Sequence, residues 1–392
     1  MKCYNFDEII DRRGTDSVKY DTLDFHYGRT DLKPFWVADM DFRTPDFILD
    51  ALKKRLEHEV FGYTMPSAAY YESIQNWLNY KYSWNVERDW ITFVPGIVKG
   101  ISYVLQCFTE PGDKVIIQPP VYHPFRLVPE KMKREVQFNP LKLVDGVYEM
   151  DFEHLESVID SRCKVLILAN PHNPGGVVWS KETLIELARI CKKHGILVIA
   201  DEIHAEMAFS SFKHYPFASV SEEAAACSIT YMAPSKTFNI AGIIASYAIV
   251  SDAALREQFY SFMEAGEYNT GNVFSYIATE AAYTHGAEWL QQMRSYVWEN
   301  VRFVEEYCSK HIPQLKVYPP QASFLVWLDC QQLGLSQKEL VSLFEDKAGL
   351  ALNDGSMFGP GGEGHMRLNI GCPRAVLREA MKSLDEAIKN HR

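Results

Sequence analysis

The stretch CSITYMAPSKTFN, residues 227–239, decides the fold. Its first half, 227–232, is a run of strand length, and its second half places Lys236 in a loop directly after that run. Similar runs alternate with helix-period segments through the middle of the chain: DKVIIQ (113–118), KVLILAN (164–170), ILVIADE (196–202) and ASYAIVS (245–251). This alternation predicts an α/β fold with a mostly parallel central sheet covered by helices.

Residues 164–202 are expected to form one β-α-β unit. Ser180 can cap a helix between the two strands, and Gly195 can end that helix. Units of this kind place functional groups at the carboxyl ends of their parallel strands. The loops after the strands are therefore the expected positions of catalytic side chains.

The two ends of the chain differ from this middle part. Near the start, Thr44 and Pro45 predict an N-cap followed by proline at the first helical position, in a helix that runs to about Val60. We expect a large domain over 46–285. The remaining segments, 1–45 and 286–392, are expected to form a second, smaller domain.

The smaller domain is predicted to be α+β. Its C-terminal part carries a long helix near 287–311 and a strand at 324–330. A capping box of Ser336 and Glu339 opens another helix. A strand at 366–371 and a final helix complete it, and the Gly-rich stretch 355–364 is interpreted as an ordered loop.

The composition and net charge of the chain limit the classes of partner that it is expected to bind. Of 392 residues, 47% are hydrophobic and 23% are charged, so the chain can bury a large core. The net charge of -11 argues against nucleic acid or an anionic membrane as the main partner, because those contacts need clustered Lys and Arg. A small-molecule substrate is expected.

The N-terminal region and the cysteine pattern predict the cellular location. The N-terminal region has no apolar segment typical of a signal peptide, and no window approaches the roughly 18 apolar residues of a membrane helix. We expect a cytoplasmic protein. The 8 cysteines are scattered with no CxxC pair, which predicts neither a disulfide framework nor a metal site.

Lys236 is the first catalytic candidate. A lysine taken alone is most often exposed, so a simple loop lysine is the alternative interpretation. In a partly desolvated pocket, however, its amine can lose a proton near neutral pH and form a Schiff base with an aldehyde. Pyridoxal phosphate (PLP) requires such an amine.

Two further polar groups follow neighbouring strands. Asp201 ends the apolar run 196–200, where it is either a cap or turn residue or the partner of a pyridinium nitrogen. Asn173 lies in NPHNPGG (170–176), a proline-fixed turn that is either structural or places the amide against a ring oxygen.

Three more segments fit a cofactor and an amino acid. In PGIVKG (95–100), free N–H groups at a helix start can hold a phosphate, although a plain helix start has the same pattern. Tyr122, after Pro119 and Pro120, can lay an aromatic face over a flat cofactor. Arg367 lies among alternating apolar residues, where it either binds a substrate carboxylate or forms a structural salt bridge.

Taken together and in this order, the motifs resemble those of fold-type-I PLP-dependent enzymes, the class I/II aminotransferase superfamily, over nearly the whole chain. The resemblance rests on PGIVKG, PPVY, NPHNPGG, DEIH, the Ser-Lys pair and an arginine strand. Within the superfamily, WVADMDF (36–42), FGYT (61–64) and DEIH (201–204) look like the cystathionine β-lyase (C–S lyase) branch of the MalY/PatB type.

The resemblance implies a role for each cofactor-binding residue. Lys236 would hold PLP as a Schiff base, Asp201 would pair with the ring nitrogen and Asn173 with the phenolic oxygen. Tyr122 would stack on the ring and, with Lys236, act in catalysis. The remaining cofactor contacts would be Ile97, Val98 and Ser235 at the phosphate, and His204 near the phenolic oxygen.

The resemblance also implies the substrate contacts and the assembly. Arg367 would take the α-carboxylate, and Ala38 would contact the substrate. Tyr63 would reach the phosphate of a neighbouring subunit, which predicts a homodimer with shared active sites.

Two departures from the wider pattern affect the phosphate. Ile244 stands where many relatives have a phosphate-binding arginine, and Ala233 replaces a frequent serine. Phosphate binding must therefore depend on backbone donors, Ser235 and Tyr63.

The implied reaction is β-elimination from a sulfur amino acid such as L-cystathionine, a cysteine S-conjugate or L-cysteine. The freed Lys236 takes the Cα proton and a thiolate leaves, giving a thiol, pyruvate and ammonia. Transamination passes through the same carbanion, so an aminotransferase is the alternative. A PLP-binding regulator that acts on DNA is a further alternative. Such regulators carry an extra N-terminal helical domain, whereas here the family pattern begins by Trp36, and the acidic charge is unsuited to DNA.

Overall fold

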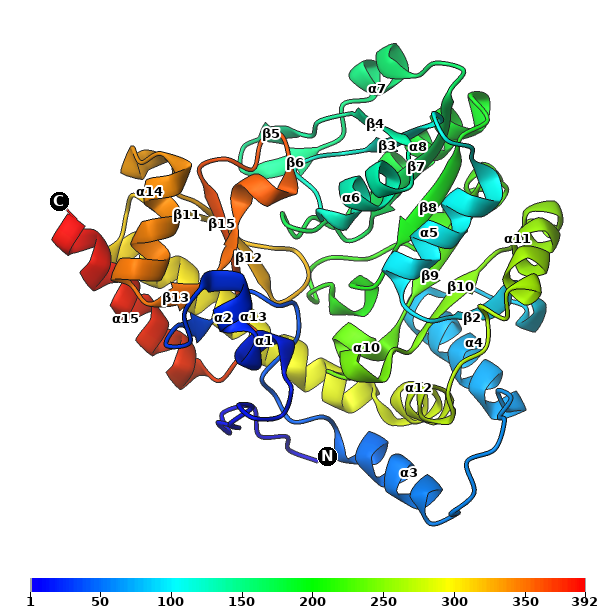
Figure 1. The fold of residues 1–392 in the computed structure, drawn as a ribbon, viewed down its shortest axis with the longest axis horizontal. Coiled ribbons are helices and arrows are strands. Elements are labelled where there is room, and N and C mark those ends of the chain that lie inside the picture. The colour runs from blue at the N-terminus through cyan, green and yellow to red at the C-terminus, as the bar shows by residue number, and fades with distance from the viewer. Residues whose placement is uncertain (1, 392) are drawn as a thin grey trace.

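A seven-stranded sheet lies at the centre of the larger part of the molecule, in a computed structural model that describes residues 2–391 (Figure 1). Its strands, in spatial order, are β2 (Ile91–Val94), β10 (Ser246–Ile249), β9 (Ser228–Met232), β8 (Leu197–Asp201), β7 (Cys163–Ala169), β3 (Lys114–Ile117) and β4 (Glu135–Phe138). Only β10 runs against its neighbours. The predicted strands and the mostly parallel sheet are confirmed; β2 and β4 were not foreseen.

The helices have the following bounds: α1 (Val18–Asp21), α2 (Leu23–Tyr27), α3 (Asp46–Leu56), α4 (Ala68–Tyr82), α5 (Ile97–Phe108), α6 (Pro124–Lys131), α7 (Phe152–Val158), α8 (Lys181–Lys193), α9 (Glu222–Ala225), α10 (Pro234–Thr237), α11 (Ala253–Ala265), α12 (Val273–His285), α13 (Ala287–His311), α14 (Gln337–Ser342) and α15 (Arg374–His391). The predicted β-α-β unit is β7, α8 and β8. Ser180 accepts a hydrogen bond from the Thr183 N–H at the start of α8, as expected for its N-cap.

Both faces of the central sheet are buried, because alternate residues of each strand point into different clusters. On β7, Val165 and Ile167 pack in the cluster with α5, α6 and α11. Leu166 and Leu168 pack on the other side, in the cluster with α7 and α8. Helices on both faces leave the strand ends as the accessible edge of the sheet.

The register of the sheet brings the predicted motifs to one edge. Asp201 pairs with Ala169 on β7 and with Tyr231 on β9. The turn after β7, the end of β8 and the lysine loop after β9 therefore leave the sheet side by side, and α10 in that loop carries Lys236.

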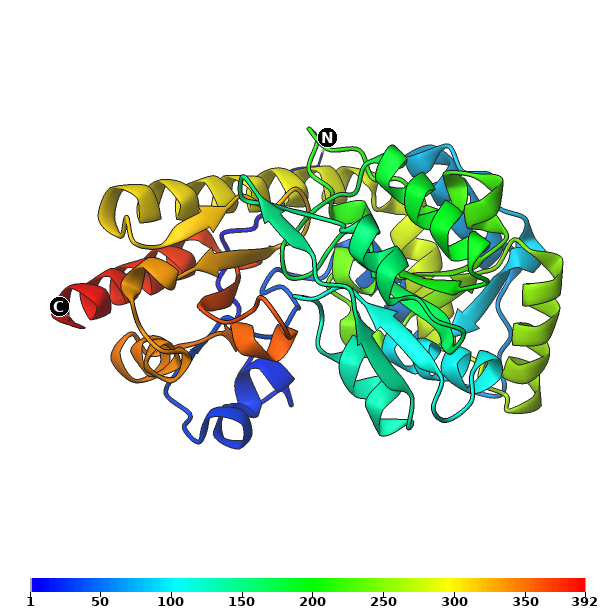
Figure 2. The same cartoon turned by 90° about the horizontal axis from the view of Figure 1, so that it is seen from above.

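A smaller antiparallel sheet forms the other part, with the order β11 (Lys316–Tyr318), β12 (Leu325–Asp329), β15 (His365–Asn369) and β14 (Asn353–Asp354). The remaining strands pair as a hairpin, β5 (Lys142–Val144) with β6 (Val147–Glu149), and as β1 (Lys33–Pro34) with β13 (Leu350–Ala351). Helix α13 extends from the smaller part to the larger one (Figure 2). The β1–β13 pair ties the N-terminal arm to the smaller part.

Two predictions near the ends of the chain have clear outcomes. The capping box is confirmed, because the Ser336 hydroxyl and the Glu339 carboxylate each accept from the other's backbone N–H at the start of α14. Thr44, however, does not cap α3. Its hydroxyl donates to the Asn239 carbonyl at 3.1 Å, and Pro45 occupies the N-cap position.

The end of α3 also differs from the prediction. The helix ends at Leu56 rather than near Val60. The Arg55 guanidinium donates to the carbonyls of His58 and Val60, at 2.8 and 3.0 Å, which stabilises a chain that has already left the helix. The domain limits expected from the sequence stay a prediction. Within residues 2–391, no helix is long and apolar enough to cross a membrane.

Candidate active site

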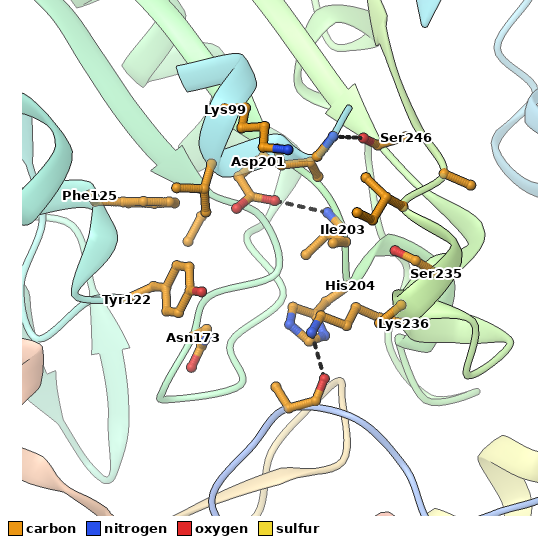
Figure 3. Close-up of a pocket in the computed structure, with 18 of the residues that line it drawn as sticks. Lys99, Tyr122, Phe125, Asn173, Asp201, Ile203, His204, Ser235, Lys236 and Ser246 are labelled. Atoms are coloured by element: carbon orange, nitrogen blue, oxygen red, sulfur yellow. Dashed lines mark hydrogen bonds between the residues drawn. The ribbon is translucent and has the colours of Figure 1, made fainter. Parts of the chain in front are cut away.

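A cavity of about 320 Å³ lies at the carboxyl ends of β7, β8 and β9 (Figure 3). Most of the site residues expected from the sequence line it: Ala38, Ile97, Val98, Tyr122, Asn173, Asp201, His204, Ser235 and Lys236. Arg367 and Tyr63 are not among the lining residues. The fold thus assembles side chains from six segments that are distant in the sequence.

Lys236 enters the cavity from α10, which begins with proline directly after β9. Its amine donates a hydrogen bond of 2.6 Å to the Ala38 carbonyl. Burial lowers the pKa of Lys236, and Arg367 lowers it further, while Asp39 and Asp201 oppose the shift. The interpretation of Lys236 as an ordinary surface lysine is therefore wrong: the side chain is partly buried in the cavity, and its pKa is shifted in the direction that favours the neutral, nucleophilic amine.

Asp201 ends β8 with its carboxyl group facing the cavity. One carboxylate oxygen accepts the Ile203 N–H at 3.1 Å, so the side chain does have the turn role considered from the sequence. That single bond does not satisfy a carboxylate, and burial raises the pKa of Asp201 to about 7. A cationic N–H in the cavity would offset the cost of burying the ionised Asp201 carboxylate.

Arg367 lies on β15 behind the cavity, with 4% of its surface exposed. Its guanidinium donates to Asn173 Oδ1 at 3.0 Å, to the Trp36 carbonyl at 3.0 Å and to Asn353 Oδ1 at 2.5 Å. No carboxylate forms an ion pair with it within residues 2–391, and its Nε has no hydrogen-bond partner there. Burial lowers the pKa of Arg367 to about 10.

The surroundings of Arg367 contradict a structural salt bridge. A buried cation held only by neutral acceptors is costly unless an anion joins it. The contact with Arg367 also fixes the amide of Asn173, because Oδ1 accepts the guanidinium N–H. The NH₂ group of Asn173 is then left to donate to another acceptor.

The start of α5 forms the wall of the cavity opposite the lysine. Gly96 has a φ of 105°, a conformation that residues with a side chain rarely adopt, and its N–H donates to Ser246 Oγ at 2.9 Å. The following amides, of Ile97 and Val98, have no intrahelical acceptor because they lie in the first turn. With the nearby Ser235, they form a set of donors suited to a phosphate.

Tyr122 and His204 complete the polar lining. Tyr122 is anchored by its backbone N–H, which donates to the Asn173 carbonyl at 3.1 Å. His204 Nδ1 lies 3.1 Å from Ser323 Oγ, and burial lowers the pKa of His204 to about 3. The imidazole is therefore neutral at physiological pH.

Tyr63 and Ile244 are two further residues that the sequence linked to phosphate binding. Tyr63 is fully exposed, in a segment without helix or strand after α3, and lies away from the cavity of its own chain. Ile244 lines the cavity in a left-handed conformation, with φ 56°. A β-branched residue there is strained, which agrees with a local constraint on this wall.

Lys99, Phe125 and Ser246 are among the lining residues to which the sequence interpretation gave no role. Lys99 belongs to PGIVKG, which gave it no role, although a cation in the first turn of a phosphate-facing helix is a usable signal. Phe125 lies three residues after Tyr122, in the first turn of α6, and its ring is 5.9 Å from that of Tyr122. Nothing in the sequence around Ser246 distinguishes it from a strand residue.

Comparisons with known proteins agree with this geometry. The family model "Aminotransferase class I and II" matches residues 35–384. The chain is 44% identical to "Cystathionine beta-lyase PatB" of Bacillus subtilis, over 98% of this chain and 100% of that protein.

Solved structures give the same result. The chain resembles a PLP-bound putative aminotransferase from Clostridium difficile 630, with a TM-score of 0.96, 42% identity and coverage of 98% and 100% of the two chains. It also resembles cystalysin from Treponema denticola, whose structure contains PLP, with a TM-score of 0.95, 32% identity and full coverage of both chains, 100% each. This chain therefore belongs to the class I and II aminotransferase family, in the branch that includes PatB.

Proposed function

We propose that the protein is a PLP-dependent carbon–sulfur lyase that cleaves L-cystathionine, and related cysteine S-conjugates or L-cysteine, to a thiol, pyruvate and ammonia. The observation that carries the proposal is the placement of the Lys236 amine in one cavity with the Asp201 carboxyl group, next to the Arg367 guanidinium, which has no anionic partner among residues 2–391. The choice of sulfur substrates rests on the relative named cystathionine β-lyase.

The residues of the cavity fit PLP. Lys236 offers an amine for its aldehyde, and Asp201, with its pKa raised to about 7, offers a carboxyl group for the ring nitrogen. Tyr122 would pack against the ring, and the NH₂ group of Asn173 would donate to the phenolic oxygen, with His204 nearby. When bound, PLP supplies an electron-accepting ring that stabilises negative charge on the substrate Cα.

The phosphate group would bind at the start of α5. The donors would be the backbone amides of Ile97 and Val98 and the hydroxyl of Ser235. Tyr63 of a second subunit would add a further donor, which is why we propose a homodimer with shared active sites. Exposed apolar side chains beside it, Val60, Phe61 and Met65, support this face as the contact.

Arg367 would bind the substrate α-carboxylate. The guanidinium has a geometry that suits a bidentate carboxylate, and its present neighbours are all neutral acceptors. Ala38, which lines the cavity, would contact the substrate. The carboxylate would supply the counter-ion that no side chain of residues 2–391 provides for this buried cation.

Lys236 would then act as the base. Burial lowers its pKa, which favours the neutral amine that can accept the Cα proton. The electron pair left on Cα forms a double bond to Cβ, and the Cβ–S bond breaks with its electron pair on sulfur. Protonation of sulfur gives the thiol, and water converts the remaining fragment to pyruvate and ammonia.

The alternative is an aminotransferase, which the resemblance to the Clostridium difficile protein keeps open. Both reactions need the same base and the same carboxylate contact. They differ in their need for an acceptor, because a transaminase stops after one half-reaction when no 2-oxo acid is present.

The deciding experiment supplies L-cystathionine and PLP without a 2-oxo acid. A lyase releases homocysteine, pyruvate and ammonia in equal amounts over many turnovers. If pyruvate never exceeds the amount of enzyme, and 2-oxoglutarate is needed to sustain turnover on ordinary amino acids, the lyase proposal is wrong.

We also propose that the enzyme is cytoplasmic, because a reducing environment suits its free cysteine thiols, most of which are buried.

A further inference from the structure

A cluster of charged side chains joins the N-terminal arm to the segment 36–42. Arg12 and Lys19 supply the cations, and Asp39 and Asp41 the carboxylates. Arg12 lies 2.7 Å from Asp39 and 2.8 Å from Asp41, and Lys19 lies 2.8 Å from Asp41 and 3.8 Å from Asp39. The Lys19 side chain is 1% exposed and that of Asp41 is 8% exposed. Each carboxylate thus faces both cations, which offsets the cost of burying them.

The segment 36–42 contacts both groups that the proposed reaction needs. The Trp36 carbonyl accepts a hydrogen bond of 3.0 Å from the Arg367 guanidinium. The Ala38 carbonyl, two residues further on, accepts the bond of 2.6 Å from the Lys236 amine. The spacing of these two carbonyls therefore helps to set the distance between the Arg367 guanidinium and the Lys236 amine.

Two asparagine side chains hold the same segment from opposite sides. Asn369 on β15 donates to the carbonyls of Val37 and Asp39, at 2.5 and 2.7 Å. Asn239 in the lysine loop donates to the Met40 carbonyl at 2.8 Å and accepts its N–H at 3.0 Å. The segment bridges the two parts of the molecule across the cavity.

Asp39 has a special position in this arrangement. It follows Ala38 directly, and both of its carboxylate oxygens accept from Arg12, at 3.0 and 2.7 Å. A two-bond contact fixes the rotation of the carboxylate as well as its position. Because the Ala38 carbonyl belongs to the peptide bond that leads into Asp39, any rotation there turns this carbonyl away from Lys236.

We propose that Asp39 is a positioning residue: held by Arg12, it fixes the segment 36–42 so that the Ala38 carbonyl orients the Lys236 amine. The same constraint keeps the Trp36 carbonyl on Arg367. The proposal rests on the proposed function, since the amine needs a fixed direction only if it transfers a proton. Neither Asp39 nor Arg12 touches the cavity contents in this role.

Asp39 also acts on Lys236 through its charge. The groups that face the amine are Asp39 from segment 36–42, Asp201 and His204 from the end of β8, and Arg367 from β15. Asp39 and Asp201 raise the pKa of the amine against the effect of burial, and Arg367 lowers it. Removal of the Asp39 charge therefore lowers the pKa of the Lys236 nitrogen further.

The test compares the wild-type holoenzyme with Asp39→Asn, Arg12→Met and the double variant. Asp160→Asn is the matched control, because Asp160 forms an ion pair with Lys114 at the opposite edge of the sheet. Steady-state cleavage of L-cystathionine gives kcat and KM. The visible absorption of the bound cofactor is titrated with pH, since it changes as the Lys236 nitrogen gains or loses its proton.

We expect Asp39→Asn to lower kcat/KM about 10- to 100-fold, the effect of a small misplacement of reacting groups. The absorbance midpoint should move about 0.5–1 unit to lower pH, because an opposite charge is lost. The double variant should be no worse than Asp39→Asn, since the two residues act as a unit. Asp160→Asn should change neither quantity.

Arg12→Lys guards against a folding artefact. It keeps the charge of Arg12 but not the two-bond contact with Asp39. Compared with Arg12→Met, Arg12→Lys should therefore bring the absorbance midpoint closer to the wild-type value than it brings kcat/KM. A wild-type midpoint and kcat/KM in folded Asp39→Asn protein would overturn the proposal, as would a loss explained by the unfolded fraction alone. Failure of the wild-type enzyme to cleave cystathionine would instead overturn the proposed function, while the absorbance titration still tests Asp39.

Discussion

Replacement of Arg367 by lysine tests the substrate contact most directly. In the present structure the guanidinium donates to Asn173, Trp36 and Asn353, which lie on three separate segments. These contacts use both terminal nitrogens and orient the group, and its charge has no anionic partner within residues 2–391. A lysine ammonium is a point charge that cannot bind a carboxylate by two parallel bonds while keeping these contacts.

The size of the effect follows from the bonds lost. A hydrogen bond to a charged group contributes about 1.5–3 kcal/mol, so loss of one arm of the fork lowers kcat/KM about 10- to 150-fold. The substitution also releases Asn173 Oδ1, and the amide is then free to turn away from the cofactor. We therefore expect some loss in kcat in addition to a higher KM.

Arg134→Lys is the matched control for this prediction. Arg134 also donates only to neutral acceptors, namely the Thr109 hydroxyl and the carbonyls of Met132, Leu105 and Thr109, but it lies at the far ends of α5 and α6. Its replacement should lower Tm and leave kcat/KM unchanged. Steady-state kinetics on L-cystathionine, with Tm measured for each variant, decide the matter. An unchanged kcat/KM for Arg367→Lys, or an equal loss for Arg134→Lys, would refute the assignment.

Three further predictions concern the lysine, its carboxyl partner and the second subunit. Lys236→Ala should abolish the visible absorption of the bound cofactor and nearly all turnover while circular dichroism stays the same; retention of both would exclude Lys236 as the cofactor lysine. Burial raises the folded pKa of Asp201 from 3.8 to about 7, so without cofactor the folded state holds more protons than the unfolded state in this range and stability falls as pH rises through it. Asp201→Asn should therefore raise the Tm of the apoprotein at pH 8 more than at pH 5, and equal shifts at both pH values would contradict the buried position. Mixed Tyr63→Ala and Lys236→Ala subunits should regain activity in hybrid dimers, whereas no recovery after verified exchange would mean that Tyr63 does not act across subunits.

Local patterns were sufficient to predict the centre of the fold and the ends of its strands. Parallel strands buried on both faces are almost continuously apolar, so β7 and β8 stand out from their surroundings. Because parallel strands share one carboxyl edge, Asp201 and Lys236 had to lie close together once the sheet was recognised. Local capping chemistry was less reliable. Ser180 caps its helix as expected, but Thr44 instead donates its hydroxyl to Asn239, a residue far along the chain.

The sequence by itself therefore determined the α/β class, the family, and the lysine and carboxyl group of the site, because each depends on residues within one strand and its following loop. Only the tertiary structure decided the state of Arg367. The choice between a salt bridge and a free cation depends on Trp36, Asn173 and Asn353, which meet Arg367 only after both sheets have formed. The bond from Lys236 to the Ala38 carbonyl is of the same kind. Neither local propensity nor periodicity carries information about which distant polar groups will share a buried space.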